Sequence, residues 1–223
     1  MQRKGKFMIN ILAGTDLFRG MSNMDIEHIL GCLGSRKTLY QKGQYVFMEG
    51  EANPKVGIIL SGKIQVVKET KNGDLILINQ LKTGDIFGLS HVCAQIKKLP
   101  ISILAVEPSE ILFIELNQLV QTCEKACQFH VKMIKNALWI LARKNLFLDT
   151  KMYYISHKTI KERLTTYLDD QAISSNSSEF EIPFNREQLA EFLCVDRSAL
   201  SRELGNMKDE GLIDYKKNWF KLL

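Results

Sequence analysis

The run from Phe184 to Ile213 constrains the fold more than any other part of the sequence, because it encodes two short helices together with their ends. It is FNREQLAEFLCVDRSALSRELGNMKDEGLI. Asn185 is suited to cap a first helix, and Gln188, three residues later, can return the hydrogen bond. Asp196 is suited to cap a second helix, and Gly211 to follow its end. Only a short turn with the residues CVD separates the two, so the run predicts a helix-turn-helix.

The second of these helices has one apolar and one polar face. At about 100° per residue, Leu200, Leu204 and Met207 fall on one side of it. The opposite side carries Ser198, Ser201, Arg202 and Gly205, and Arg197 flanks them at the N-terminal end. Arginine can bind guanine in a bidentate way, and serine can reach phosphates or base edges. A solvated surface is the alternative for such a face taken alone, but the strands LIDY and WFKLL that follow predict a wing, and the combination predicts binding in the major groove of DNA.

Electrostatic attraction must act locally in this part of the chain. The whole sequence has a formal net charge of +5, but from His157 onward 10 basic residues face 12 acidic ones. The excess of positive charge therefore belongs to the earlier part. DNA is expected to contact a local basic patch rather than a generally positive domain.

Short strands separated by glycine dominate the N-terminal half, from about Phe7 to Leu116. They include YVFMEGE, VGIILSGKIQVVKE, LILINQL, ISILAVE and EILFIEL. Asn72 and Gly73 are suited to the two positive-φ positions of a tight hairpin turn between two of them. Regularly spaced short strands with such turns predict an antiparallel, jelly-roll-like β-roll.

A heptad stripe follows the strands. Its members recur at alternating steps of three and four residues, which is typical of a coiled-coil seam. The stripe comprises Val131, Ile134, Leu138, Leu141, Asn145, Leu148, Met152 and Ile155. A helix packed on its own domain is the alternative, but so narrow a stripe favours a homodimer held by a long helix. Asn145 is its polar member, and a buried asparagine can fix register at a cost in stability.

Composition indicates a soluble, cytoplasmic protein. Of the 223 residues, 45% are apolar and 25% charged, which is ordinary for a chain with a folded core. No apolar run approaches the roughly 18 residues of a membrane helix, and the N-terminus lacks a convincing cleavage site, so no membrane is expected as a partner. The five cysteines, an odd number without an export signal, are expected to be thiols or ligands rather than disulfides.

Taken together, these motifs resemble the CRP/FNR superfamily of bacterial transcription regulators over nearly the whole chain. The resemblance rests on GDIFG after glycine-punctuated strands, on the long helix, and on the helix-turn-helix run. It implies an α+β chain with a cyclic-nucleotide-binding-like effector domain in residues 1–122, a dimerisation helix in 123–156 and a winged helix-turn-helix in 157–223. It also implies a homodimer on a palindromic duplex operator, with RNA polymerase and an unknown small-molecule effector as further partners.

The resemblance also assigns roles to single residues of the DNA-binding part. The expected set is Arg186, Arg197, Ser198, Ser201 and Arg202. Arg197, Ser198 and Arg202 match base-reading positions, and Arg186 on the first helix matches a phosphate-contacting one. Cys194 stands where the family's turn usually has glycine, which leaves the backbone conformation of the turn open, because a non-glycine residue there would pay for a positive φ.

The cassette that binds cyclic nucleotides in this family has lost its anion-binding residues here. Members that bind cyclic AMP carry a glutamate just after G-[DE]-x-x-G and an arginine followed by serine or threonine later on. Leu89 replaces the glutamate and Leu99-Pro100 the pair, and the neighbouring Lys97 and Lys98 lack a bidentate fork. We therefore expect an apolar or aromatic effector other than cyclic AMP. The predicted pocket comprises Gly84, Phe87, Gly88, Leu89, His91, Leu99 and Trp139.

Other interpretations stay open at this point. Cys123, Cys127 and His130 have the spacing of one helix stripe and could bind a metal or sense redox state, with Cys93 or His91 as a fourth ligand. His91 also lies in the stretch where haem-binding members have their ligand. A cysteine-dependent enzyme using Cys127 and His130, and a ligand-binding module with a vestigial DNA-binding part, are the remaining alternatives. A non-enzymatic DNA-binding regulator fits best, with no cofactor assigned.

Overall fold

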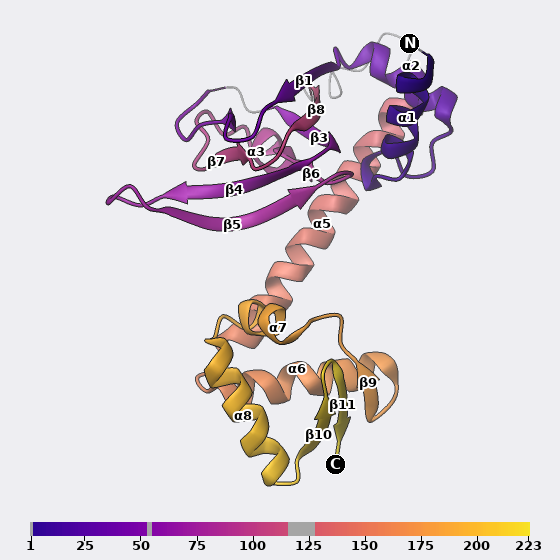
Figure 1. Ribbon diagram of the computed structural model, residues 1–223. Helices are drawn as coiled ribbons and strands as arrows, with labels where there is room; N and C mark the ends of the chain where they lie inside the picture. The colour runs from indigo at the N-terminus through magenta and orange to yellow at the C-terminus, as the bar shows by residue number, and fades with distance from the viewer. Residues whose placement is uncertain (1, 53–54, 116–127) are drawn as a thin grey trace. The chain divides into compact units, whose positions relative to one another are not determined.

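The computed structural model describes residues 2–52, 55–115 and 128–223, with side chains from residue 7 onward. The chain forms two compact units, Met1–Ala142 and Arg143–Leu223 (Figure 1). The predicted α+β class is confirmed: antiparallel sheets come first, then a long helix, then a winged helix-turn-helix. None of the helices in the described ranges has the length and apolar character that crossing a bilayer requires.

Helices, not strands, form the first part of the chain, so the prediction of strands from about Phe7 was wrong for the segment that ends at residue 32. The elements are α1 (Gln2–Ala13), the 3-10 turn η1 (Asp16–Phe18) and α2 (Asn23–Cys32). Ser22 and Asp25 form a capping box at the start of α2. The Ser22 hydroxyl accepts from the Asp25 N–H at 3.2 Å, and the Asp25 carboxylate accepts from the Ser22 N–H at 2.9 Å.

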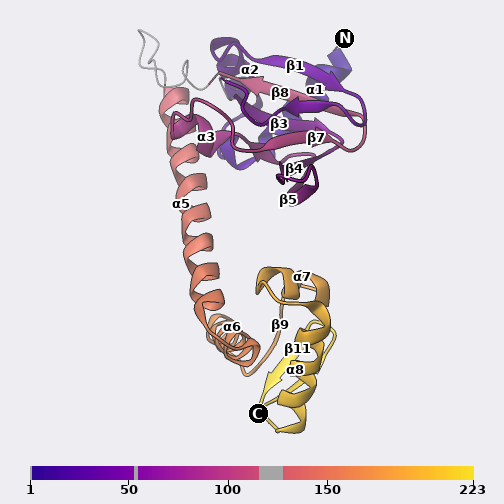
Figure 2. The same ribbon diagram turned by 90° about the vertical axis from the view of Figure 1, so that its left-hand side faces the viewer.

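Two four-stranded antiparallel sheets form the β-roll among the described residues (Figure 2). The first sheet has the order β1 (Arg36–Tyr40), β8 (Ser109–Ile114), β3 (Val56–Ser61), β6 (Ile86–Phe87). The second has the order β2 (Tyr45–Phe47), β7 (Ser102–Ala105), β4 (Lys63–Glu69), β5 (Leu75–Lys82). Ile59 and Ile111 of the first sheet share a buried cluster with Ile64 and Ile103 of the second, so the two apolar faces pack against each other.

The hairpin between β4 and β5 is built differently from the prediction. Gly73 has a φ of 87°, but Asn72 is not among the described residues with positive φ. The Thr70 hydroxyl accepts hydrogen bonds from the N–H groups of Asn72 at 3.3 Å and Asp74 at 3.2 Å. Because this hydroxyl satisfies the turn, only the glycine needs the left-handed conformation, as in longer hairpin loops.

Gly88 connects β6 to the short helix α3 (Leu89–Cys93) and has a structural role of its own. Its φ is 81°, and a Cβ atom added there would lie 2.2 Å from the backbone oxygen of Lys55. Only glycine fits such a conformation so close to a neighbouring backbone. The glycine of the GDIFG motif is thus required by the fold of the roll, with or without a ligand.

The long helix α5 (Gln128–Ser156) contributes to both units. Near its start, Met133 and Ala137 are buried in a cluster with Leu12, Leu17 and other residues of the N-terminal helices. The Asn136 amide donates to the backbone oxygens of Leu17 at 2.9 Å and of Arg19 at 3.0 Å. Near its end, Tyr154 belongs to the core of the C-terminal unit.

The C-terminal unit contains three further helices and a small sheet. Its elements are α6 (Ile160–Ser175), β9 (Glu179–Glu181), α7 (Arg186–Phe192), α8 (Arg197–Asp209), β10 (Ile213–Lys216) and β11 (Trp219–Leu222). The predicted wing hairpin β10–β11 is present, but β9 pairs with β11 as a third strand that the sequence did not predict. The three strands and three helices enclose one apolar core.

Two tyrosines in this core differ in how their hydroxyls are satisfied. The Tyr154 hydroxyl donates to the Asp170 carboxylate at 2.9 Å. The Tyr167 ring packs at 5.5 Å from that of Tyr154, but its buried hydroxyl has no hydrogen-bond partner among the described residues. Burial raises the pKa of both phenols, and for Tyr154 the Asp170 carboxylate raises it further.

Candidate nucleic-acid interface

The caps predicted for α7 and α8 are present. The Asn185 side chain accepts from the Gln188 N–H at 2.9 Å, and the Gln188 side chain accepts from the Asn185 N–H at 2.9 Å. The Asp196 carboxylate accepts from the N–H groups of Ser198 at 2.8 Å and Ala199 at 3.0 Å, and also from the Ser198 hydroxyl. These bonds lower the pKa of Asp196, which keeps the cap ionised at neutral pH. Both helices therefore begin at fixed residues.

The turn between α7 and α8 passes through Cys194, whose φ is 53°. Cys194 therefore has the left-handed conformation that glycine would adopt without strain. Arg163 of α6 braces the turn from behind: it donates to the backbone oxygens of Leu193 at 3.1 Å, Cys194 at 3.4 Å and His157 at 2.9 Å. Sequence reasoning missed these contacts because Leu193 and Cys194 lie 30 and 31 residues from Arg163 along the chain.

The predicted faces of α8 are confirmed by burial. Leu200 and Leu204 are fully buried and Met207 nearly so, whereas the polar side is exposed. The exposed side chains are Arg197, Ser198, Ser201 and Arg202. The Ser201 hydroxyl donates to the Arg197 backbone oxygen at 2.9 Å, so its oxygen keeps both lone pairs and can still accept hydrogen bonds. The face thus combines two guanidinium forks with two small hydroxyls on a rigid helix.

Arg186, the first residue of α7, is held by the wing. Its guanidinium lies 5.0 Å from the centre of the Tyr215 ring and 5.8 Å from that of Phe220, and it donates to the Lys217 backbone oxygen at 3.4 Å. Burial lowers the pKa of Arg186, but the ordinary value is so high that the group stays charged. Tyr215 and Lys217 were not predicted as site residues, although Tyr215 ends the first predicted strand of the wing and Lys217 lies between its two strands.

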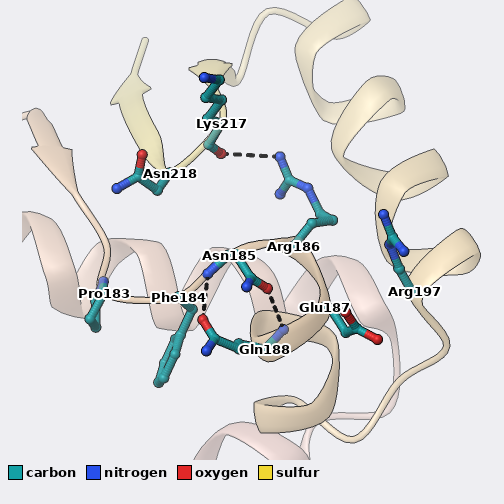
Figure 3. A pocket seen from close by; sticks show the side chains of 9 residues that line it. All are labelled: Pro183, Phe184, Asn185, Arg186, Glu187, Gln188, Arg197, Lys217 and Asn218. Atoms are coloured by element: carbon teal, nitrogen blue, oxygen red, sulfur yellow. Dashed lines mark hydrogen bonds between the residues drawn. The ribbon is translucent and has the colours of Figure 1, made fainter.

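A cleft of about 620 Å³ opens between the start of α7, the start of α8 and the wing turn (Figure 3). Its basic residues are Arg186, Arg197 and Lys217, each from a different element. Its other lining residues are Pro183, Phe184, Asn185, Glu187, Gln188 and Asn218. The cleft therefore carries more positive than negative charge beside the exposed face of α8.

The residues of the predicted effector pocket lie in several environments. Phe87 belongs to the core between the sheets, whereas Leu89 belongs to the cluster under the N-terminal helices. Leu99 is buried, and His91 lies on α3. Trp139 on α5 lies under the Arg19 guanidinium, 4.8 Å from the ring centre. Gly84 has a φ of 91° before β6, with open space around it. A pocket that joins these residues stays a prediction.

Only part of the predicted cluster of cysteines and histidine lies in the described ranges. Cys123 and Cys127 lie outside the described residues, while His130 is buried at the start of α5. Cys93, raised earlier as a fourth ligand, has its pKa raised by burial. Within the described ranges, no three histidine, cysteine or acidic side chains come together in a way that could hold a metal ion.

The predicted dimer seam on α5 contains both exposed and partly covered residues. Leu138, Leu148 and Met152 are exposed, at 61%, 46% and 64% of their surface. Ile134 and Leu141 pack partly against the core of the N-terminal unit. Asn145 is exposed, and its amide donates to the Asp149 carboxylate at 3.1 Å.

Comparison with known proteins identifies relatives for both units. The family described as cyclic nucleotide-binding domain matches residues 37–126, and the one described as Crp-like helix-turn-helix domain matches residues 162–223. Electron transport regulator A of Shewanella oneidensis is 27% identical over 189 residues, 81% of this chain and 72% of the relative. The transcriptional activator protein FnrA of Stutzerimonas stutzeri is 20% identical over 206 residues, 90% of this chain and 82% of the relative. The crystal structure of the Thermus thermophilus catabolite activator protein superposes with a TM-score of 0.55 at 20% identity, over 94% of both chains.

Proposed function

Because the chain belongs to the CRP/FNR superfamily of DNA-binding transcription regulators, we propose that it acts as a homodimer that reads a palindromic operator through α8. The observation that carries the proposal is the face of α8: two exposed arginines, Arg197 and Arg202, stand on a helix that is capped at its start and buried along its other side. Such a face can enter a major groove, where guanidinium groups recognise guanine. RNA polymerase is the partner through which the bound regulator would act.

The seam on α5 supports the homodimer. Leu138, Leu148 and Met152 each expose about half or more of their surface along one side of the helix, in the heptad register of the sequence. A second copy of α5 would bury them. Asn145 would then lie in the seam as its polar member, with its amide within reach of an asparagine in the second copy.

The effector is proposed to be an apolar or aromatic small molecule rather than a cyclic nucleotide. Leu89 and Leu99 stand where cyclic-AMP-binding members have their glutamate and their arginine pair, and both are buried, at 5% and 3% exposure. Neither leucine can compensate the charge of a buried phosphate. The chain keeps the roll but offers no carboxylate or guanidinium at those two positions.

Selection of duplexes from a random pool tests the DNA-binding part of the proposal. We expect one palindromic motif, with half-site centres about 34 to 36 Å apart, because a two-fold dimer must reach successive major grooves on one side of the DNA. Arg202→Ala should cost about 1 to 3 kcal/mol on that motif and relax the preference at one base pair in each half-site. An equal loss on unrelated sequences would make Arg202 a phosphate contact. A wild-type protein without any sequence preference would contradict the proposed function.

A further inference from the structure

The wing holds Arg186 in one place before any DNA arrives. Tyr215 and Phe220 face each other across β10 and β11, with ring centres 5.9 Å apart and planes 26° from parallel. They form a platform of two rings, and the Arg186 guanidinium lies over both. A free arginine side chain on a surface loses rotamer entropy when it binds an anion, whereas one that is already ordered loses little.

Within the part of the chain that the structure describes, no carboxylate forms an ion pair with this arginine. Among the described residues, Arg186 takes part in none of the ion pairs, although Glu187 lines the same cleft. Its hydrogen-bond partner within the protein is the neutral backbone oxygen of Lys217. Burying part of a cation without an opposite charge costs free energy, and a bound anion would recover that cost. Arg197 and Lys217 add two more cations to the cleft.

From the resemblance, Arg186 is expected to contact a phosphate of the DNA backbone. We propose that Tyr215 is the positioning residue that holds the Arg186 guanidinium in the cleft for that contact. The inference rests on the proposed function and deepens it. Arg197 lines the cleft and also begins α8, so a phosphate in the cleft would belong to the strand next to the bases that α8 reads. Tyr215 does not touch the DNA itself: its ring fixes the guanidinium, and Arg186 makes the contact.

Salt dependence of operator binding separates this role from a general effect on folding. Each phosphate neutralised by a basic side chain contributes about 0.9 to the slope of log affinity against log salt concentration. Tyr215→Leu should weaken binding about tenfold at 0.1 M salt and lower the slope by about 0.9 for each protomer, equally for all operator variants. Tyr215→Phe keeps the ring and should restore both affinity and slope.

Three further variants keep the test decisive. Trp219→Leu removes an aromatic residue of the same hairpin that no ring contact joins to Arg186, and Lys208→Met removes the other cation near Tyr215, 5.7 Å from its ring. Both should bind like the wild type.

Arg186→Lys tests the proposal even if the tyrosine variant fails to fold. It keeps the charge but not the planar fork, and should lose affinity much as Tyr215→Leu does. Unchanged affinity and slope in Tyr215→Leu or in Arg186→Lys would overturn the proposal. A changed base preference in either would do so as well. If the wild-type protein itself shows no sequence-specific binding, the proposed function is refuted instead.

Discussion

The two units differ in what they leave exposed. In the C-terminal unit the exposed functional face is charged, and none of Arg186, Arg197 and Arg202 forms an ion pair among the described residues. The N-terminal unit exposes an apolar strand instead: four consecutive residues of β5, Leu75 to Ile78, expose 48% to 56% of their surface. The apolar seam of α5 runs through both units, with Leu138 of the first 61% exposed and Met152 of the second 64% exposed. One chain therefore already presents a complete charged surface, whereas its apolar surfaces require a further partner to be buried.

A second difference concerns which residues each unit has kept. The C-terminal unit has both the helix caps that shape its fold, Asn185 and Asp196, and exposed arginines suited to bind DNA. In the N-terminal unit Gly88 meets a strict backbone requirement of the roll, while the neighbouring Leu89 stands where a ligand-binding glutamate would be. Gly88 is thus required by the packing of the roll, whereas position 89 carries the change that is expected to remove cyclic-nucleotide binding.

The largest expected effect tests that packing. Gly88→Ala should destabilise the N-terminal unit by about 4 kcal/mol or more, because the new Cβ would add a collision with the Lys55 backbone to the strain of a positive φ. Gly84→Ala is the matched control: its φ is also positive, at 91°, but the space around it is open, so it should cost about 1 kcal/mol. Denaturant unfolding of both variants measures the difference. Equal losses of unfolding free energy in the two variants would mean that the backbone around Gly88 can shift to accommodate a Cβ atom.

The next effect concerns the exposed apolar side chains of α5. Leu138→Lys should convert the dimer to a monomer and weaken operator binding about a hundredfold or more, because the two half-sites would no longer be bound as one unit. Leu146→Lys is the matched control, since Leu146 is 65% exposed on the same helix but lies outside the heptad seam. Sedimentation with both variants decides the point. If Leu138→Lys stays dimeric, or if Leu146→Lys becomes monomeric, the seam is placed wrongly.

A smaller effect on stability is expected from the buried tyrosine hydroxyls of the C-terminal unit. Tyr167→Phe removes a buried hydroxyl without a partner and should raise the free energy of unfolding by about 1 kcal/mol. Tyr154→Phe removes a hydroxyl that donates to Asp170 and should lower it by about 1 to 2 kcal/mol. The two rings touch, so the pair compares like with like. A loss of stability in Tyr167→Phe would mean that its hydroxyl has a partner, such as an ordered water.

No effect at all is expected from cyclic nucleotides. A ligand at 100 times its dissociation constant stabilises the folded state by about 2.7 kcal/mol, which is easily seen as a rise in melting temperature. With Leu89 and Leu99 in place of the anion-binding residues, cyclic AMP and cyclic GMP at millimolar concentration should leave both the melting temperature and the operator affinity unchanged. A micromolar dissociation constant in calorimetry would show that other groups, such as Lys97, Lys98 or backbone amides, replace the missing ones.

Local signals made the C-terminal unit predictable. The caps at Asn185 and Asp196 and the apolar side of α8 depend on residues within a few positions of each other, and each was found as predicted. The contacts that were missed join distant positions: Arg163 braces the turn 30 residues later, and β9 pairs with a strand about 40 residues away. No periodicity in a sequence reveals such pairings.

The N-terminal errors have a different cause. The capping box at Ser22 and Asp25 was a local signal for α2, but it was overlooked among the strand-like segments that follow. At the β4–β5 hairpin, the Thr70 hydroxyl offered the backbone an alternative to the two-residue turn that Asn72 and Gly73 suggested. The effector pocket stays a prediction, because a pocket depends on how residues from several strands and helices face one another.

The positive φ of Cys194 has a consequence for how this sequence can change. A residue with a side chain costs about 1 kcal/mol or more in that conformation, which glycine adopts freely. Cysteine and glycine codons differ by a single nucleotide, so one point mutation could remove this backbone strain. Because the Cys194 side chain is exposed and lies outside both the buried core and the polar face of α8, that mutation would stabilise the helix-turn-helix without altering the bases it reads. A change to glycine at position 194 could therefore compensate for destabilising substitutions elsewhere in the helix-turn-helix, including substitutions that alter which operator is bound.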